Sequence, residues 1–213
     1  MTGTADLVAV LERSRDLGLL GPGPVTDHIR HAEVFVEVLD DLDEDLDGGG
    51  PSRFVDLGSG GGAPGLILGV AWGEAAGLLL DGQLRRVRFL ADALETLGID
   101  DRVAAVHGRA EALAHDPAVR QRADVVTARS FGPPGITAEC AVGFLRPGGR
   151  LLVAEPPEDL EVRWPAEPLA SLGLLDEGVT RRPSGSVRSL RLVGELDPAI
   201  PRRTAAMHRR PRF

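Results

Sequence analysis

The chain contains no lysine, because all 24 of its basic residues are arginine. Any role that requires a lysine amine must therefore be filled by another side chain. Cys140 is the only cysteine, which excludes an internal disulfide and a cysteine-rich metal site. No apolar run approaches the roughly 20 residues that span a bilayer, and the N-terminus lacks the basic-then-apolar order of a signal peptide. These absences predict a cytoplasmic protein without metal or membrane span.

The 213 residues are 43% hydrophobic, enough for one domain with a full core. The net charge of −8 argues against nucleic acid as a partner, but the charge is unevenly distributed. One acidic cluster comprises Glu37, Asp40, Asp41, Asp43, Glu44, Asp45 and Asp47. Residues 198–213 contain no acid and carry Arg202, Arg203, Arg209, Arg210 and Arg212. Such a basic tail either binds a phosphate backbone or is simply a solvated terminus.

A glycine-rich loop follows the strand that we expect at residues 53–57. Its glycines are Gly58, Gly60, Gly61, Gly62 and Gly65. Without Cβ atoms the loop can adopt positive φ and let a ligand lie against its backbone, and Pro64 suits the start of a helix. Strand, loop and helix together are typical of the first turn of a cofactor-binding α/β sheet. The same residues also fit a dinucleotide fingerprint, or a glycine-rich connection that binds nothing.

Strands and helices alternate along most of the chain, which predicts a parallel sheet with helices on both faces. The expected strands are 53–57, 78–81, 103–106, 123–128 and 150–154, with a late hairpin at 174–180 and 186–196. The expected helices are 7–20, 26–39, 66–77, 84–97, 134–145 and 168–172, and residues 146–149 form a tight turn. We divide the chain into an N-terminal helical extension with an acidic linker (1–50), the α/β domain (51–197) and the basic tail (198–213).

Polar residues stand at the carboxyl ends of these strands, where such sheets bind ligands. They are Asp56, Asp81, Ala110 with Glu111, Arg129 and Glu155. Asp56 can accept hydrogen bonds from a ligand's ammonium or hydroxyl groups. Asp81 lies about 20 residues beyond the loop, where a carboxylate can bind both ribose hydroxyls, although it could also cap the helix at 84–97. His28 and His31 are spaced for a metal, but no third ligand is indicated nearby.

Several motifs resemble one family. They are FVDLGSGGGAPG at 54–65, LDGQLRRVRFL at 80–90, GRAE at 108–111 and TARSF at 127–131. Upstream, DHI at 27–29 with Ala32 matches in order, and downstream so does IPRR at 200–203 with Arg209, Arg210 and Pro211. Together these resemble the RsmG (GidB) family, the 16S ribosomal RNA guanine-N7 methyltransferases.

The resemblance implies a Rossmann-like, seven-stranded class I methyltransferase sheet that binds S-adenosylmethionine and methylates 16S rRNA, alone or in the small ribosomal subunit. By match to the family motifs, Gly58 and Ala63 line the methionine part of the cofactor. Gly60 and Asp56 are also predicted to bind the cofactor. Asp81 binds the ribose, and Ala110 and Glu111 flank the adenine. Arg129 lies beside the cofactor and faces the guanine or its phosphate, which makes it the candidate catalytic residue. Arg202, Arg203, Arg209 and Arg210 are the candidate RNA contacts.

The chain departs from the family pattern at the fifth strand, where Glu155 and Pro156 replace a Lys-Gly pair. A glutamate repels RNA phosphate where a lysine holds it. Gly82 replaces a serine and Ser130 an alanine. One alternative is therefore a paralogue that methylates a small molecule or another RNA. The glycine loop alone leaves a second alternative, a dinucleotide-binding oxidoreductase. Arg129 could also pair with Glu111 or Asp56 and only maintain the shape of the pocket.

Overall fold

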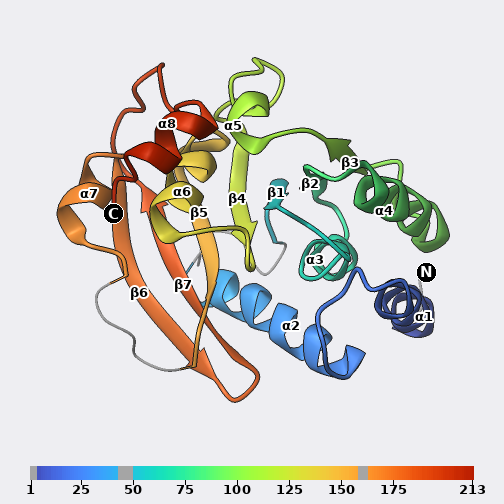
Figure 1. Ribbon diagram of the computed structural model, residues 1–213. Coiled ribbons are helices and arrows are strands. Elements are labelled where there is room, and N and C mark those ends of the chain that lie inside the picture. The colour runs from blue at the N-terminus through green and yellow to red at the C-terminus, as the bar shows by residue number, and fades with distance from the viewer. Residues whose placement is uncertain (1–3, 43–49, 158–162) are drawn as a thin grey trace.

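The computed structural model describes residues 4–42, 50–157 and 163–213, which form one sheet between two helical layers (Figure 1). The sheet has seven strands in the order β3-β2-β1-β4-β5-β7-β6. The first five strands are β1 (Arg53–Leu57), β2 (Ala76–Asp81), β3 (Val103–His107), β4 (Ala123–Ala128) and β5 (Leu145–Glu155), which pair in parallel. β6 (Leu174–Arg182) and β7 (Gly185–Leu192) form a hairpin, and β7 runs antiparallel to β5.

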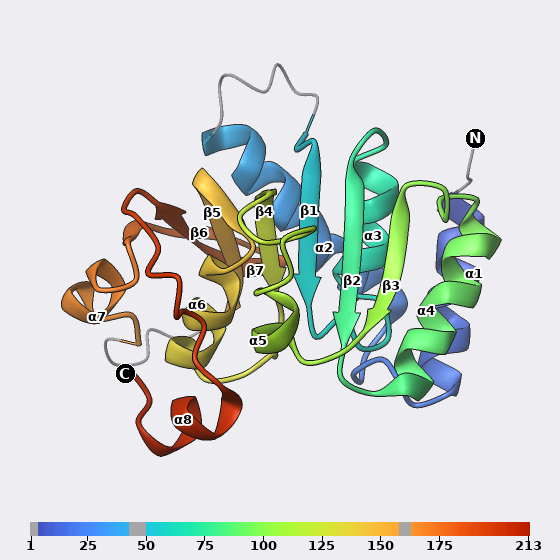
Figure 2. The ribbon, with the colours of Figure 1, turned by 90° about the horizontal axis from the view of Figure 1, so that it is seen from above.

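Alternate side chains of the central strands enter two separate cores. Phe54 of β1 packs in the core beneath α1 (Thr4–Asp16), α2 (Val25–Leu42), α3 (Gly65–Ala71) and α4 (Leu84–Leu97). Its neighbour Val55 packs in the core on the opposite face, with α6 (Pro134–Val142), α7 (Ala166–Ala170) and α8 (Thr204–Arg209). The short α5 (Ala110–Leu113) follows β3 on that second face (Figure 2). The period of two that defines a strand thus gives each helical layer its own apolar partner.

The predicted parallel strands and late hairpin are confirmed, with ends within about five residues. The helix expected at 66–77 is wrong in its second half, because α3 ends at Ala71 and β2 begins at Ala76. Gly73 follows the C-cap Trp72, and glycine is a common helix terminator. The tight turn expected at 146–149 lies inside β5, where the register with β4 jumps between Leu145 and Arg150. Pro147, Gly148 and Gly149 therefore form an irregularity within β5 rather than a separate turn.

The acidic cluster begins on a helix and not in a linker. Glu37 and Asp41 lie on α2, where their carboxylates accept from Arg182 of β6 at 3.0 and 2.9 Å. The cluster members from Asp43 onward lie outside the described residues. None of the helices in the described ranges is long and apolar enough to cross a membrane.

The close packing of β1 against β2 generates one prediction. A Cβ added to Gly77 would lie 2.4 Å from ring atoms of Phe54, whose ring is itself fixed edge-on against Trp72 at 5.3 Å. Gly77→Ala should therefore lower the free energy of unfolding by about 1–3 kcal/mol, because the buried ring must shift. Urea denaturation measures the change. Gly73→Ala is the matched control, since its Cβ would meet nothing within 4 Å, and an equal loss in both variants would contradict the packing described.

Candidate cofactor and substrate site

The loop after β1 has the backbone conformation that the sequence predicts. Gly58, Gly60 and Gly62 have φ values of 67°, 55° and 99°, a region that other residues rarely adopt. A Cβ on Gly58 would come within 2.9 Å of the Phe131 ring, so a side chain there would fill the space beside the loop. Helix α1 anchors the loop, because the Ser14 hydroxyl donates to the Gly61 carbonyl at 2.8 Å.

Asp81 connects the glycine loop to the end of β2. Its Oδ2 accepts from the Gly60 amide at 2.9 Å and lies 3.4 Å from a guanidinium nitrogen of Arg86. Its Oδ1 accepts from the Gln83 amide at 2.8 Å, at the start of α4. Gln83 is the N-cap of α4, so Asp81 holds the residue before the helix rather than capping the helix amides, and the expected cap is not found. Asp81 still stands where a ribose would be bound.

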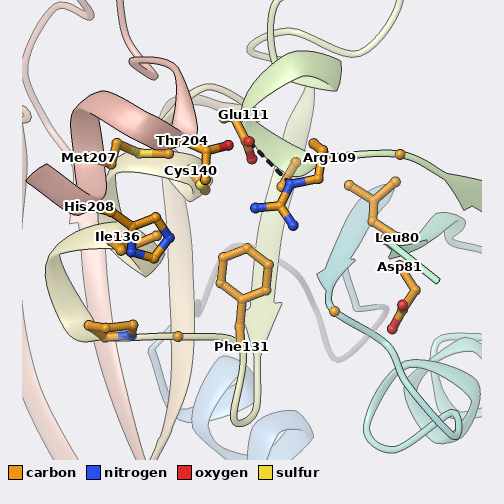
Figure 3. Close-up of a pocket in the computed structure, with 16 residues that line it drawn as sticks. Leu80, Asp81, Arg109, Glu111, Phe131, Ile136, Cys140, Thr204, Met207 and His208 are labelled. Atoms are coloured by element: carbon orange, nitrogen blue, oxygen red, sulfur yellow. Dashed lines mark hydrogen bonds and ion pairs between the residues drawn. The ribbon is translucent and has the colours of Figure 1, made fainter.

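A small cavity of about 140 Å³ lies beyond the ends of β1, β2 and β3. It brings together the predicted residues Gly58, Asp81, Ala110 and Glu111 (Figure 3). Across the cavity stand residues from the second face, which are Ile136, Cys140, Thr204, Met207 and His208. The carboxylate of Glu111 lies 3.3 Å from Nε of the exposed Arg109. Gly58 with its positive φ, two carboxylates and an apolar wall fit an adenosine group.

Asp56 lies behind the glycine loop rather than in it. Its side chain is fully buried, and Oδ1 accepts from the Thr127 hydroxyl at 2.8 Å. Gly65 lies so close that an added Cβ would meet Oδ2 at 2.5 Å. The structure therefore differs from the expectation that Asp56 contacts a ligand directly, and its carboxylate supports the loop and the start of α3. Ala63, also predicted as a cofactor residue, is likewise buried in the first core.

Arg129 lines a second and larger cavity, of about 670 Å³, next to the first. Its guanidinium donates to Nδ1 of His28 at 2.9 Å, and Nε2 of the same ring lies 3.2 Å from the Gly21 carbonyl. Since Nδ1 accepts, the ring proton belongs on Nε2, where it donates to Gly21. Burial and the charge of Arg129 lower the pKa of His28, which favours this neutral ring. The hydrogen-bond partner of Arg129 is thus His28, while the charge of Asp56 also acts on Arg129 and opposes the lowering of its pKa by burial.

The histidine pair is therefore part of this second cavity. Burial, followed by the charge of Arg129, lowers the pKa of His31 to about 4. A guanidinium bonded to His28 occupies the lone pair that a metal would need and adds positive charge beside it. Among the described residues there is no group of three or more histidines, cysteines or carboxylates placed to hold a metal.

Glu155, the marked departure from the family pattern, is neutralised within the site. The Arg163 guanidinium donates to its Oε2 at 2.7 Å, and the Trp164 indole donates to Oε1 at 2.6 Å. Both partners line the second cavity together with Glu155. The repulsion that a bare glutamate would exert on phosphate is thus largely cancelled by the neighbouring arginine.

The four arginines predicted to contact RNA fall into two groups. Arg202 is bound to the buried Glu139, with its Nε at 2.7 Å and a terminal nitrogen at 2.6 Å from the carboxylate. The Arg202 guanidinium bonds the end of the chain to α6, which counts against a contact with RNA. Arg203, Arg209 and Arg210 are exposed, around the short helix α8.

Sequence reasoning missed three features of the site. Phe131 lines both cavities and stands where they meet. His28 was noticed in a motif without being connected to Arg129, which is distant in sequence. The packing of α8 against the domain was also not predicted, because arginines surround this helix. The signal was the apolar Ile200 before α8 and Met207 on it, both of which are buried.

Comparison with known proteins identifies the family of the chain. The model of the family described as "GidB: rRNA small subunit methyltransferase G" matches residues 26–160. Ribosomal RNA small subunit methyltransferase G of Leuconostoc citreum is 34% identical over 145 residues, which are 67% of this chain and 60% of that protein. The Mycobacterium leprae protein of the same name is 35% identical over 75% of this chain and 62% of its own length. The chain thus spans about 60% of the length of these two relatives.

Solved structures share the whole architecture. A putative O-methyltransferase from Klebsiella pneumoniae superimposes with a TM-score of 0.62 at 16% identity, covering 91% of each chain. Cofactor-bound Rv0187 from MTB gives a TM-score of 0.62 at 18% identity, covering 90% of each chain. At such low identity the likeness shows the fold alone, which is that of class I S-adenosylmethionine-dependent methyltransferases.

The buried carboxyl of Asp56 generates a pH-dependent prediction. Burial raises its pKa from 3.8 to about 6, so the folded state holds the proton more tightly than the unfolded chain. Stability from this group is complete below about pH 4 and is lost as the pH rises towards 6 and above. Asp56→Asn keeps an acceptor for Thr127 and cannot ionise. We expect it to gain roughly 1–3 kcal/mol in unfolding free energy, relative to the wild type, between pH 4 and pH 7.

Chemical denaturation at several pH values tests this expectation. Asp100→Asn serves as the control, because this exposed carboxylate lies at the amino-terminal ends of the strands, away from the site. A difference between Asp56→Asn and wild type that is the same at pH 4 and pH 7 would show that Asp56 ionises as freely when folded as when unfolded.

Proposed function

The chain belongs to the rRNA small subunit methyltransferase G family, and from that premise we propose that it transfers a methyl group from S-adenosylmethionine to N7 of a guanine in 16S rRNA. One observation carries the proposal. A cavity with carboxylates suited to an adenosine shares Phe131 and Gly132 with a larger neighbouring cavity, which is lined by the half-buried Arg129. A methyl donor and an acceptor base would meet at that junction.

The residues of the first cavity suit the proposed cofactor. Asp81 would accept from the ribose hydroxyls, while Ala110 and Glu111 would flank the adenine. The backbone of Gly58, which lines this cavity, would lie against the methionine part, with Gly60 further along the same loop. When bound, S-adenosylmethionine supplies a methyl group on a positively charged sulfur, which leaves as a thioether.

The second cavity suits an acceptor that requires no deprotonation. Guanine N7 carries a free lone pair and no proton, so the transfer needs alignment and exclusion of water rather than a general base. Arg129 would donate to guanine O6 or to a neighbouring phosphate. His28 fixes one of its nitrogens and leaves other guanidinium N–H groups for the substrate. The pairing of Glu155 with Arg163 weakens one of the two reasons to favour a small-molecule substrate, the other being the acidic net charge.

The proposed partner is 16S rRNA, alone or in the small ribosomal subunit, which places the enzyme in the cytoplasm. Arg203, Arg209 and Arg210 would contact the phosphate backbone. They are exposed on the C-terminal segment, residues 197–213, which lies beside the first cavity. Their positive charge compensates locally for the acidic net charge of the chain.

Substitution of Asp81 and Arg129 should separate binding from transfer. Asp81→Ala is expected to weaken S-adenosylmethionine binding by roughly 10- to 100-fold, because two charge-assisted hydrogen bonds are lost. Arg129→Gln should leave that affinity within about threefold but lower the rate of transfer by at least roughly tenfold. Calorimetry gives the first quantity, with NAD as the competing ligand. Labelled-methyl transfer to small subunits from a strain that lacks this modification gives the second.

Each outcome has a definite meaning. Binding of NAD in place of S-adenosylmethionine would overturn the proposed cofactor. Affinity that survives Asp81→Ala would overturn the assignment of the ribose site. Wild-type protein that binds the cofactor but leaves the small subunit unlabelled would overturn the proposed substrate. Arg122→Gln is the control for Arg129→Gln, because Arg122 lies just before β4 and Arg129 just after it.

RNA affinity should depend steeply on salt through the exposed C-terminal arginines. Replacing Arg203, Arg209 and Arg210 together by alanine removes up to three phosphate contacts. The slope of log affinity against log salt should then fall by roughly two to three, since each contact contributes about 0.7–0.9. A filter-binding series between 50 and 300 mM salt, on the order of the physiological range, measures it. The charge-matched control replaces Arg15, Arg88 and Arg122, and an equal fall in that variant would refute a specific role for the C-terminal segment.

A further inference from the structure

The C-terminal segment, residues 197–213, forms one side of the adenosine cavity. Thr204, Met207 and His208 of this segment line it, opposite Leu80 and Asp81 (Figure 3). Met207 is only 1% exposed, so its side chain points inward and not to solvent. The match to the family model ends at residue 160, so this wall lies outside the part of the chain that the match covers.

A buried carboxylate clamps the segment to α6. The side chain of Glu139 is 1% exposed and accepts from three nitrogens of Arg202, which are the backbone amide, Nε and a terminal guanidinium nitrogen, at 2.6–2.9 Å. Nε of Arg212 lies 3.3 Å away. Burial alone would raise the pKa of Glu139, but the bonds from Arg202 lower it overall. A charge this buried is stable only while its partners stay in place, so the clamp holds the segment in one position.

Further contacts fix the segment before and after the clamp. His115 lies 2.8 Å from the Pro201 carbonyl, and Arg120 donates to the Ile200 carbonyl at 2.9 Å. At the other end, Arg212 donates to the Ser171 hydroxyl at 3.0 Å. The segment is thus tied down by residues that follow α5 and α7 as well as by α6.

We propose that residues 197–213 are an integral part of the cofactor site, supplying the wall against which the adenine of S-adenosylmethionine packs. The inference rests on the proposed function and assigns Met207 as a cofactor contact. An adenine ring requires apolar surface on both faces. Leu80 lies on one side of the cavity, and across it Met207 stands with Ile136 and Cys140 of α6 (Figure 3). Without α8, that second side is left to α6 alone.

Two substitutions test the wall and the clamp separately. Met207→Ala removes part of the wall and should weaken S-adenosylmethionine binding by roughly 5- to 50-fold, in proportion to the lost apolar contact. Arg202→Gln lies outside the cavity and leaves Glu139 short of its main partner. It should also weaken binding, and the double variant with Glu139→Gln should recover part of the loss, because the buried charge is removed. Calorimetry with S-adenosylmethionine and with S-adenosylhomocysteine measures each affinity.

Ile99→Ala is the matched control, since it truncates a buried side chain just before β3, at the amino-terminal ends of the strands. It should lose stability comparable to Met207→Ala and keep the wild-type affinity. Limited trypsin digestion gives a second measurement, in which the cofactor should slow cleavage after Arg203 and Arg209 in the wild type.

The outcomes separate the two proposals. Wild-type protein that binds no S-adenosylmethionine contradicts the proposed function. Wild-type protein that binds it, while Met207→Ala and Arg202→Gln bind equally well and trypsin cleavage is unaffected, contradicts the role of the C-terminal segment alone.

Discussion

The hydrogen bond from the Gly60 amide to the Asp81 carboxylate connects the two strand ends on which the site is built. Gly60 forms it with a φ of 55°, a backbone conformation that residues with a side chain rarely adopt. Asp81 in turn organises the start of α4 through Gln83. Behind the loop, Gly65 lies against Asp56, so the helix that follows begins directly over a buried carboxylate. Substitutions that push either contact apart would displace the backbone that the cofactor is proposed to touch.

The sheet could be predicted because its strands are short, apolar and bounded by turn residues, as at 53–57 and 123–128. The placement of Gly58, Asp81, Ala110 and Glu111 in one cavity followed from the rule that ligands bind at the carboxyl ends of parallel strands. Element ends were less predictable: α3 stops early at Trp72 and Gly73, and β5 continues through residues 146–149. In those places tertiary pairing outweighed local turn preference.

The remaining parts of the site depend on pairs that are distant in sequence. Arg129 meets His28 across 101 positions, and Arg202 meets Glu139 across 63. No local pattern indicates which arginine of a basic run faces a buried acid. For this reason Arg202 resembled Arg203 in the sequence, although one is bound internally and the other is exposed. The role of Glu155 was hidden in the same way, because its charge is balanced by Arg163 and Trp164.

Trp164 gives this architecture an optical consequence. The chain has two tryptophans and no tyrosine. Trp72 is buried against Phe54 in the first core, whereas the indole of Trp164 donates to Glu155 and lies 6.0 Å from the ring of Phe213. Its emission therefore originates between the larger cavity and the end of the C-terminal segment. A Trp72→Phe protein would carry one intrinsic fluorophore at that junction, so events on either side could be followed without an attached dye.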